Sequence, residues 1–320
     1  MAQPVNTFSR YGQIGVRESL QDVINDVSVT EVPLYSMITK SMMASKNTIL
    51  EWQTDILAAA NANNAAIEGD TFSAAAVTPT LRLSDVTQIL KKPFIISDTA
   101  IAMNAAGREN EVKYQIIKQG KELKRDIEAA MLSNNAAVAG NNTTARKFAG
   151  LETWIATNVS SGVGGSSTII ASGSPITAPV DGTQRAFSEA LLKAAIAVAI
   201  PNGAKMKTLF LGVGNKQAFS VFPGIAQTRY DVRDADMSAI IGAADIYVSD
   251  FGKIGVIPNI FQRNRTALGI DTDYVRLRHL RPMESRQYAK ISDGEQWELI
   301  YEGTLECGNE RAHFKVADLL

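Results

Sequence analysis

The side chains that most often catalyse reactions or bind metals are scarce in this chain. It has two histidines, His279 and His313, and one cysteine, Cys307. Two histidines without a spaced carboxylate make a poor metal site and offer little for acid–base catalysis. One cysteine excludes an internal disulfide and a Cys-rich zinc module, and no nearby residue would activate its thiol. We therefore predict no catalytic residue, no metal and no cofactor.

One short segment has the glycines of a phosphate-binding loop. Residues 212–216 (GVGNK) lie between a predicted strand and a predicted helix. They lack the G-x-x-x-x-G-K-[ST] spacing, and Gln217 stands where G-x-G-x-x-G requires glycine. A tight strand-to-helix turn explains the segment better. Two acidic clusters, which lack the glycine and the terminal glutamate of a calcium loop, are Asp231, Asp234 and Asp236, and Asp271 with Asp273.

Arginines occupy one face of a predicted strand at residues 274–280. Arg276 and Arg278 alternate there with Val275 and Leu277, so both guanidinium groups point to the same side. Such a face can contact phosphate or the acidic side chains of a neighbouring subunit. We favour the second because the net charge of the whole chain is −1 and no aromatic residue interleaves the arginines.

Composition indicates a folded protein of one large domain or two interleaved ones. The 320 residues are 45% hydrophobic and 20% charged. The near-neutral charge argues against bulk electrostatic binding to nucleic acid or membrane, so any DNA contact is expected to be weak and non-specific. The first ten residues contain no apolar signal, and the longest apolar run, residues 194–200, is far short of the ~20 that span a bilayer. We expect a cytoplasmic, soluble chain without a membrane partner.

The first hundred residues predict an extended arm followed by a long hairpin. A strand over residues 48–56 and a second strand-like run over 81–89 enclose an Ala- and Asn-rich tip at 57–76. We place a possible irregularity at Ser84-Asp85. Isolated hairpins are marginal in water, so this one packs on its own domain or reaches a neighbour.

The strongest helical pattern covers residues 107–135. At about 1.5 Å per residue it would span ~42 Å. Lys124 and Glu128 form an i,i+4 pair of opposite charge on the polar side, and Gly120 predicts a close backbone approach or a bend. The apolar stripe consists of Val112, Ile116, Gly120, Leu123, Ile127 and Met131.

The remainder predicts a loop-rich segment and an α+β unit. Residues 158–184 are rich in Ser and Gly, which suits a loop, an irregular hairpin or a linker. Helices at 186–200 and 215–219 follow, and residues 292–294 are a hairpin turn. We expect the strands to form one sheet flanked by helices. They are predicted at 206–211, 244–249, 253–257, 274–280, 288–291 and 297–305.

This order of parts resembles the major capsid proteins of tailed phages with the Hong Kong 97-type fold. The resemblance is clear over roughly residues 30–155 and architectural beyond them. The segments that carry it are Thr30 to Ile38, Ile49 to Leu57, Ala66 to Asp70, Gln88 to Ser97, Glu109 to Leu132 and Phe148 to Ile155.

The resemblance implies an α+β capsid fold and a division of the chain. The long helix at 107–135 would be the spine of a peripheral domain, and an axial domain would lie near the centre of a capsomer. The implied parts are an N-terminal arm (1–46), an extended loop (47–97), the peripheral domain (98–185), the axial domain (186–280) and C-terminal strands that return to the peripheral domain (281–320).

The implied function is structural. Copies of the chain would form hexamers and pentamers of an icosahedral shell around double-stranded DNA, assembled in the host cytoplasm, with portal, scaffold and decoration proteins as further partners. An encapsulin-like compartment is the alternative, and an α+β enzyme is the less favoured one. The residues expected to contact other subunits are Trp52, Glu68, Asp70, Phe72, Arg82, Arg276 and Arg278.

Two further expectations follow from comparing the chain with that family. The best-known member cross-links its shell through a lysine of the extended loop, but no lysine occurs here between Asn47 and Leu90. We therefore predict no covalent bond from this loop. Some relatives also carry a long N-terminal scaffolding segment. Only some forty-six residues precede the loop here, so a scaffold would be a separate protein or would have been removed.

Overall fold

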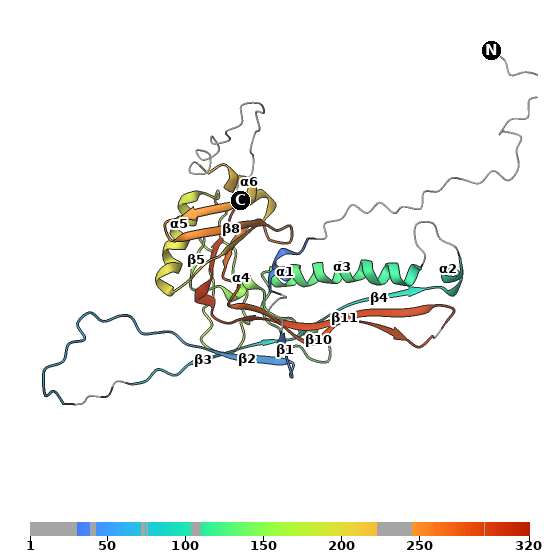
Figure 1. The fold of residues 1–320 in the computed structure, drawn as a ribbon, viewed down its shortest axis with the longest axis horizontal. Helices are drawn as coiled ribbons and strands as arrows, with labels where there is room; N and C mark the ends of the chain where they lie inside the picture. Colours follow the sequence, from blue (N-terminus) through green and yellow to red (C-terminus); the bar gives the residue numbers. More distant parts are fainter. Residues whose placement is uncertain are drawn as a thin grey trace, which may run out of the picture.

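The structure is a computed structural model that describes residues 31–38, 43–71, 74, 76–103, 110–222, 245–290 and 292–320. Figure 1 shows a body built on a mixed sheet, with a long helix and its sheet extending to one side and a thin two-stranded ribbon to the other. The C-terminus lies on the body. Among the described helices, none combines the length and apolarity that crossing a bilayer requires.

The body contains a six-stranded sheet covered by two helices. Helix α5 (Glu189–Ala199) begins where the Ser188 side chain accepts a hydrogen bond from the backbone N–H of Leu191. It ends in a 3₁₀ turn, η2 (Ile200–Asn202), closed by Gly203 at φ 88°. Helix α6 is Val213–Ser220. The strand order is β5 (Val159–Ser160), β12 (Phe314–Ala317), β9 (Thr266–Ile270), β6 (Thr208–Leu211), β8 (Gly252–Pro258) and β7 (Ile246–Ser249).

The extension is a four-stranded sheet with the long helix α3 (Glu111–Met131) packed on it. A side-chain methyl at Gly120 would lie 3.7 Å from Leu299 Cδ2, an ordinary van der Waals contact with a side chain, so the helix and sheet do not require a glycine here. The strand order is β1 (Met43–Ala44), β10 (Val275–Tyr288), β11 (Glu295–Cys307) and β4 (Gln88–Ile96). The short helices are α1 (Pro33–Ile38), α2 (Asp98–Ala102), α4 (Leu151–Trp154) and the 3₁₀ turn η4 (Glu310–Ala312).

The ribbon is a two-stranded antiparallel sheet of β2 (Ile49–Thr54) and β3 (Leu81–Val86). The expected second strand does not continue through residue 89. It breaks at Thr87, not at Ser84-Asp85, and β4 then joins the four-stranded sheet. The Thr87 hydroxyl donates to Glu302, which fixes the break on β11.

Several sequence-based expectations about elements are wrong. The described strands of the second half lie in two sheets, not one: β10 and β11 belong to the four-stranded sheet and the others to the six-stranded sheet. One strand, β10, runs from Val275 to Tyr288 with a register shift between His279 and Glu284; the strand expected at 274–280 is its first half, and of the strand expected at 288–291 only Tyr288 belongs to it. Strands β9 and β12 were not predicted. The long helix ends at Met131, four residues before the expected Asn135, and begins after the cap residue Asn110; residues 107–109 lie outside the described part.

Candidate subunit interface

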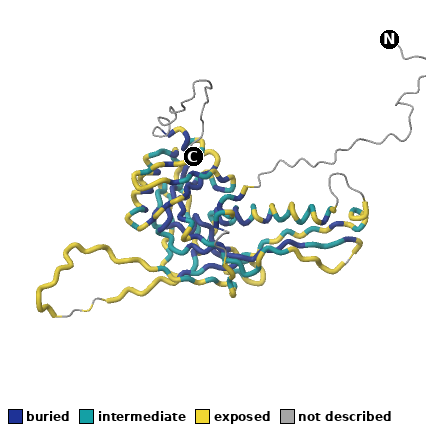
Figure 2. Tube along the Cα trace, in the orientation of Figure 1, coloured by how far each residue is buried: buried dark blue, intermediate teal, exposed yellow. Residues whose placement is uncertain are grey.

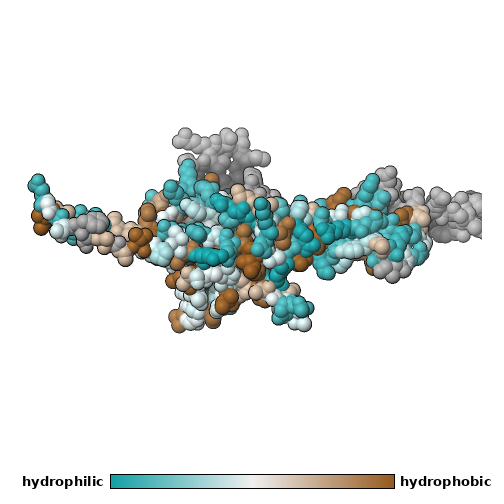
Figure 3. Space-filling view, turned by 90° about the horizontal axis from the view of Figure 1, so that it is seen from below, coloured by the Kyte–Doolittle hydropathy of each residue, from teal (hydrophilic) through white to brown (hydrophobic). Residues whose placement is uncertain are grey.

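The tip of the ribbon makes no buried contact with its own chain. From residue 55 to residue 82, every described residue is exposed (Figure 2). Three large apolar side chains are almost fully open to solvent: Leu57 is 94% exposed, Ile67 82% and Val77 93%. Figure 3 shows apolar surface on this projection at the left of the molecule. Large apolar side chains held in solvent on a projecting segment are typical of a protein–protein contact.

The same segment carries charge of one sign. No lysine or arginine occurs between Asn47 and Leu81, whereas Asp55, Glu68 and Asp70 are all exposed. The surface that receives the tip must therefore supply apolar contacts and tolerate, or neutralise, three carboxylates.

The root of the ribbon is fixed by the core. The Trp52 ring packs against the fully buried Trp154 of α4, with centroids 5.2 Å apart. Leu83 is 4% exposed, and the backbone of Ser84 donates to the carbonyl of Gly173. The core therefore fixes the direction of the ribbon at its root, and the tip, whose described residues are all exposed, is free to contact a neighbour.

Asp85, near the end of β3 at the root of the ribbon, has a buried carboxyl group with a raised pKa. It is buried and accepts a hydrogen bond from the backbone N–H of Ala149 at 3.2 Å. Burial raises the pKa of Asp85 to about 8, because desolvation of the carboxylate outweighs the backbone hydrogen bonds that it accepts. Asp85 is therefore protonated in the folded chain at neutral pH.

This state predicts a pH-dependent stability. Because the folded pKa lies above the unfolded value of 3.8, the folded chain binds the extra proton between about pH 4 and pH 8. The free energy of unfolding should fall as pH rises through that window, by at most about 1.4 kcal/mol per pH unit from this group. Urea unfolding from pH 4 to 9 measures it. Asp85→Asn should flatten the profile, and an unchanged profile in that variant would contradict the assignment.

The residues predicted to contact other subunits are placed in three environments. Glu68 and Asp70 lie exposed at the tip, whereas Trp52 is half-buried against its own core. Arg82 forms an ion pair with Glu51 across the ribbon. Phe72 lies outside the described residues.

The two arginines of β10 also have partners in their own chain. Arg276 and Arg278 both pair with Glu306 of the adjacent strand β11, Arg276 at 3.3 Å. The structure therefore brings these two together with a carboxylate, far from the tip of the ribbon (Figure 1). Each remains a predicted inter-subunit contact.

The residues considered as candidates for catalysis make structural contacts or are buried. A side chain at Gly212 would clash with Asn264, so the glycine turn reflects packing, and Lys216 pairs with Asp245 at 3.0 Å. His313 Nδ1 accepts from the backbone N–H of Asp271 at 3.1 Å, and burial lowers the pKa of His313 to about 3. Burial raises the pKa of the Cys307 thiol. The acidic cluster at 231–236 lies outside the described residues.

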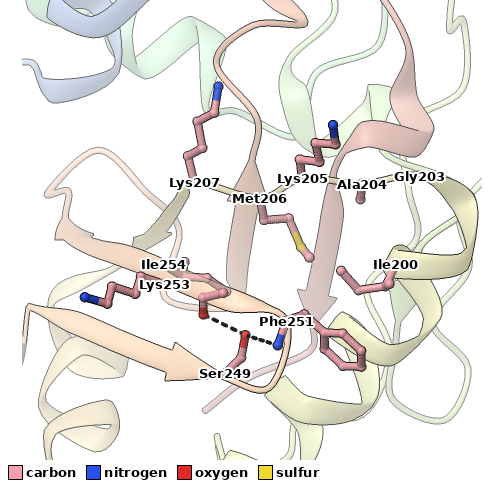
Figure 4. Close-up of a pocket in the computed structure, with 11 residues that line it drawn as sticks. Ile200, Gly203, Ala204, Lys205, Met206, Lys207, Ser249, Phe251, Lys253 and Ile254 are labelled. Atoms are coloured by element: carbon pink, nitrogen blue, oxygen red, sulfur yellow. Dashed lines mark hydrogen bonds between the residues drawn. The ribbon is translucent and has the colours of Figure 1, made fainter.

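A cleft beside the six-stranded sheet is equally poor in reactive groups. It holds about 470 Å³ and is lined by Ile200 of η2, by residues 203–207 that lead into β6, and by the ends of β7 and β8 with the turn between them (Figure 4). Figure 4 shows Met206 and Phe251 facing each other across it, with the Lys205 and Lys207 ammonium groups turned away. Its lining contains no carboxylate, histidine or cysteine. Within the described ranges, no three His, Cys, Asp or Glu side chains are grouped as metal ligands.

One buried carboxylate was missed by the sequence. Glu128 of α3 does not pair with Lys124 on the polar side, as its spacing suggested; it is fully buried. It accepts hydrogen bonds from the backbone N–H groups of Leu34 (2.9 Å) and Tyr35 (2.6 Å) and from the Asn259 side chain. Burial raises the pKa of Glu128. This carboxylate joins α1, α3 and the segment after β8.

Comparisons with known proteins agree with one another. The model of the SU10 major capsid protein family matches residues 3–320. The curated "Major capsid protein" of Escherichia phage Phieco32 is 41% identical over 136 residues, which is 42% of this chain and 38% of that protein. The alignment thus covers well under two thirds of that relative's length.

Solved structures share the fold at low sequence identity. The capsid chain of Cyanophage A-1(L) matches with a TM-score of 0.65 at 14% identity, over 95% of this chain and 97% of that one. A chain of Mycobacterium phage Ogopogo matches with a TM-score of 0.58 at 11% identity, over 95% and 96%. A structure of Phage G major capsid and decoration proteins matches with a TM-score of 0.54 at 11% identity, over 99% of both chains. The expected α+β phage capsid fold is confirmed.

Proposed function

The chain belongs to the SU10 major capsid protein family, and on that premise we propose that it assembles into hexamers and pentamers of an icosahedral phage head around double-stranded DNA. The proposed location is the virion, after assembly in the cytoplasm of the host. Portal, scaffold and decoration proteins are proposed as further partners; decoration proteins accompany the capsid protein in the Phage G structure.

The observation that carries this proposal is the exposed ribbon tip. A chain that worked alone would gain nothing from holding Leu57, Ile67 and Val77 in water on a projecting segment. Extensions that reach from each copy to the next produce head-to-tail contacts, and such contacts close into rings when the rotation between copies allows it. Capsomers are rings of this kind.

We propose that the tip lies on an adjacent subunit, with Glu68, Asp70 and Phe72 among its contacts. Trp52 and Arg82 support it by fixing the root and pairing the strands. The pairing of β4 with β11 along its whole length favours an extended loop of residues 47–87, with 88–97 part of the peripheral domain. The arm, peripheral, axial and C-terminal parts are otherwise proposed as the resemblance implies, except that β12 pairs with β9 of the body.

The exposed ribbon tip is explained by a structural role and requires no catalysis. We propose that the chain is not an enzyme. No observation favours an encapsulin-like compartment. Because no lysine lies between Asn47 and Leu90, cohesion through this loop is proposed to be non-covalent. Denaturing electrophoresis of purified particles should show one monomer band, and a ladder of covalent multimers would contradict this.

Expression of the chain followed by size-exclusion chromatography and negative-stain microscopy tests the proposal. The expected product is a hollow particle of megadalton mass, and nucleic acid extracted from filled particles separates a phage head from a protein-filled compartment. A small soluble oligomer, obtained also when a scaffold protein is co-expressed, would contradict a shell function.

A further inference from the structure

The solvent face of α3 has an unusual composition. Of the 21 residues of this helix, those classed as exposed are four lysines and one isoleucine. The lysines run along about 17 Å of helix at 1.5 Å per residue. They are Lys113, Lys118, Lys121 and Lys124, and the isoleucine is Ile117. We call these five residues the lysine face.

Three of the four acidic residues of the helix are directed elsewhere, and the fourth, Glu122, is half-buried and forms no ion pair with the lysines. Asp126 pairs with Lys92 of β4 at 2.7 Å, Glu111 accepts from the Gln115 side chain, and Glu128 is buried against α1. In the part of the chain that the structure describes, none of the four lysines has a carboxylate within 4.0 Å. A solvated helix face normally mixes both signs, because i,i+4 pairs of opposite charge stabilise it. Four like charges with no acidic partner among the described residues raise the free energy of the isolated chain unless something anionic lies nearby.

Two anionic partners for the lysine face are available in a shell. The first is the ribbon tip of another copy, which carries three carboxylates. That tip also needs an apolar surface for Leu57, Ile67 and Val77, and the lysine face offers only Ile117. The second is a phosphate backbone, which is highly charged and needs no apolar partner. The composition of the face matches the phosphate backbone better.

The residue type points the same way. The exposed charges are all ammonium groups, without arginine forks or aromatic rings that would read or stack on bases. Lysine acts on phosphate as a mobile point charge, so it neutralises a backbone without fixing a sequence. A chain of net charge −1 can then hold DNA weakly through one local surface.

We propose that the lysine face of α3 contacts the phosphates of the DNA inside the shell, so that this side of the helix faces the interior. The proposal rests on the proposed shell function and goes beyond it by naming the DNA-contacting surface. Figure 1 shows α3 and the ribbon extending in opposite directions from the body, so a chain's own ribbon does not lie over its own lysine face.

Acetylation of lysines by an amine-reactive reagent, read by mass spectrometry, tests this in filled particles, empty particles and unassembled subunits. The lysines of α3 should be several-fold less reactive in filled than in empty particles. Lys205 and Lys253, exposed lysines of the cleft on the body, are the internal comparison and should not change between the two. Equal reactivity of the α3 lysines in filled and empty particles would overturn the proposal. If they are protected in both but reactive in free subunits, their partner is another copy of the chain, which also overturns it.

A binding measurement provides a second, independent check. Fluorescence anisotropy with a short DNA duplex, repeated across salt concentrations, gives the slope of log K against log salt. Lys118→Gln with Lys121→Gln should reduce the slope by about 1.8, since each phosphate contact contributes about 0.9. The pair Lys205→Gln with Lys253→Gln removes the same charge and should leave the slope unchanged. Equal slopes for the two pairs would overturn the proposal. If the unmodified chain forms no particle by microscopy, it is the shell function that fails.

Discussion

A chain that lacks residues 60–75 is expected to fold normally and to form no particles. Every described residue of that segment is exposed, so its removal takes away no buried contact and leaves the roots of β2 and β3 on the core. The loss should be complete because the tip is proposed to connect each subunit to the next. Circular dichroism and thermal unfolding report the fold, and negative-stain microscopy reports assembly.

Replacing residues 60–75 with a Gly/Ser segment of equal length is the matched control for that deletion. It keeps the reach of the ribbon but removes Ile67, Glu68 and Asp70. If the tip acts through its side chains, this variant should fail in the same way as the deletion. Particles of normal size from the deleted chain would count heavily against an inter-subunit role for the ribbon.

Glu128→Ala is expected to have the largest effect on the subunit itself. It leaves the backbone N–H groups of Leu34 and Tyr35 and the Asn259 amide without their buried acceptor. Hydrogen bonds to a charged group contribute about 1.5–3 kcal/mol each and are not additive, so we expect a loss of about 3 kcal/mol in the free energy of unfolding. Helix α1 should detach, because Glu128 accepts from the backbone N–H groups of its first turn.

Urea unfolding measures the loss, and hydrogen exchange of residues 33–38 reports the detachment of α1. Glu122→Ala, on the same helix but not fully buried, controls for the change in helix propensity and should cost far less. Equal losses in the two variants, or unchanged exchange at α1, would show that Glu128 does not hold α1 on the core.

Local patterns predicted the elements that depend on local physics. The apolar stripe of α3 places Leu123, Ile127 and Met131 in the core, and all three are fully buried. The cap at Ser188 and the stop near Gly203 bound α5 close to the expected ends. The resemblance predicted the capsid fold because it rests on the order of such elements along the chain.

Non-local pairing is what the sequence did not reveal. The second half of β10, residues 281–287, was not predicted because it is polar and half-exposed, and only its partner β11 makes the strand continuous. Glu128 was assigned to solvent because its spacing from Lys124 is that of a surface pair, whereas the donors that bury it lie 94 and 93 residues away. Arg276 and Arg278 were predicted to contact a neighbouring subunit because their partner Glu306, about 30 residues away, comes next to them only in the folded sheet.

The ribbon tip is exposed in the free subunit and is proposed to be covered by another copy in the shell. Hydrogen exchange of peptides within residues 55–82, compared between unassembled subunits and purified particles, tests it most directly. We expect fast exchange in the free subunit and slowing by orders of magnitude in the particle. Equally fast exchange in both states, in particles shown by microscopy to be intact, would contradict it.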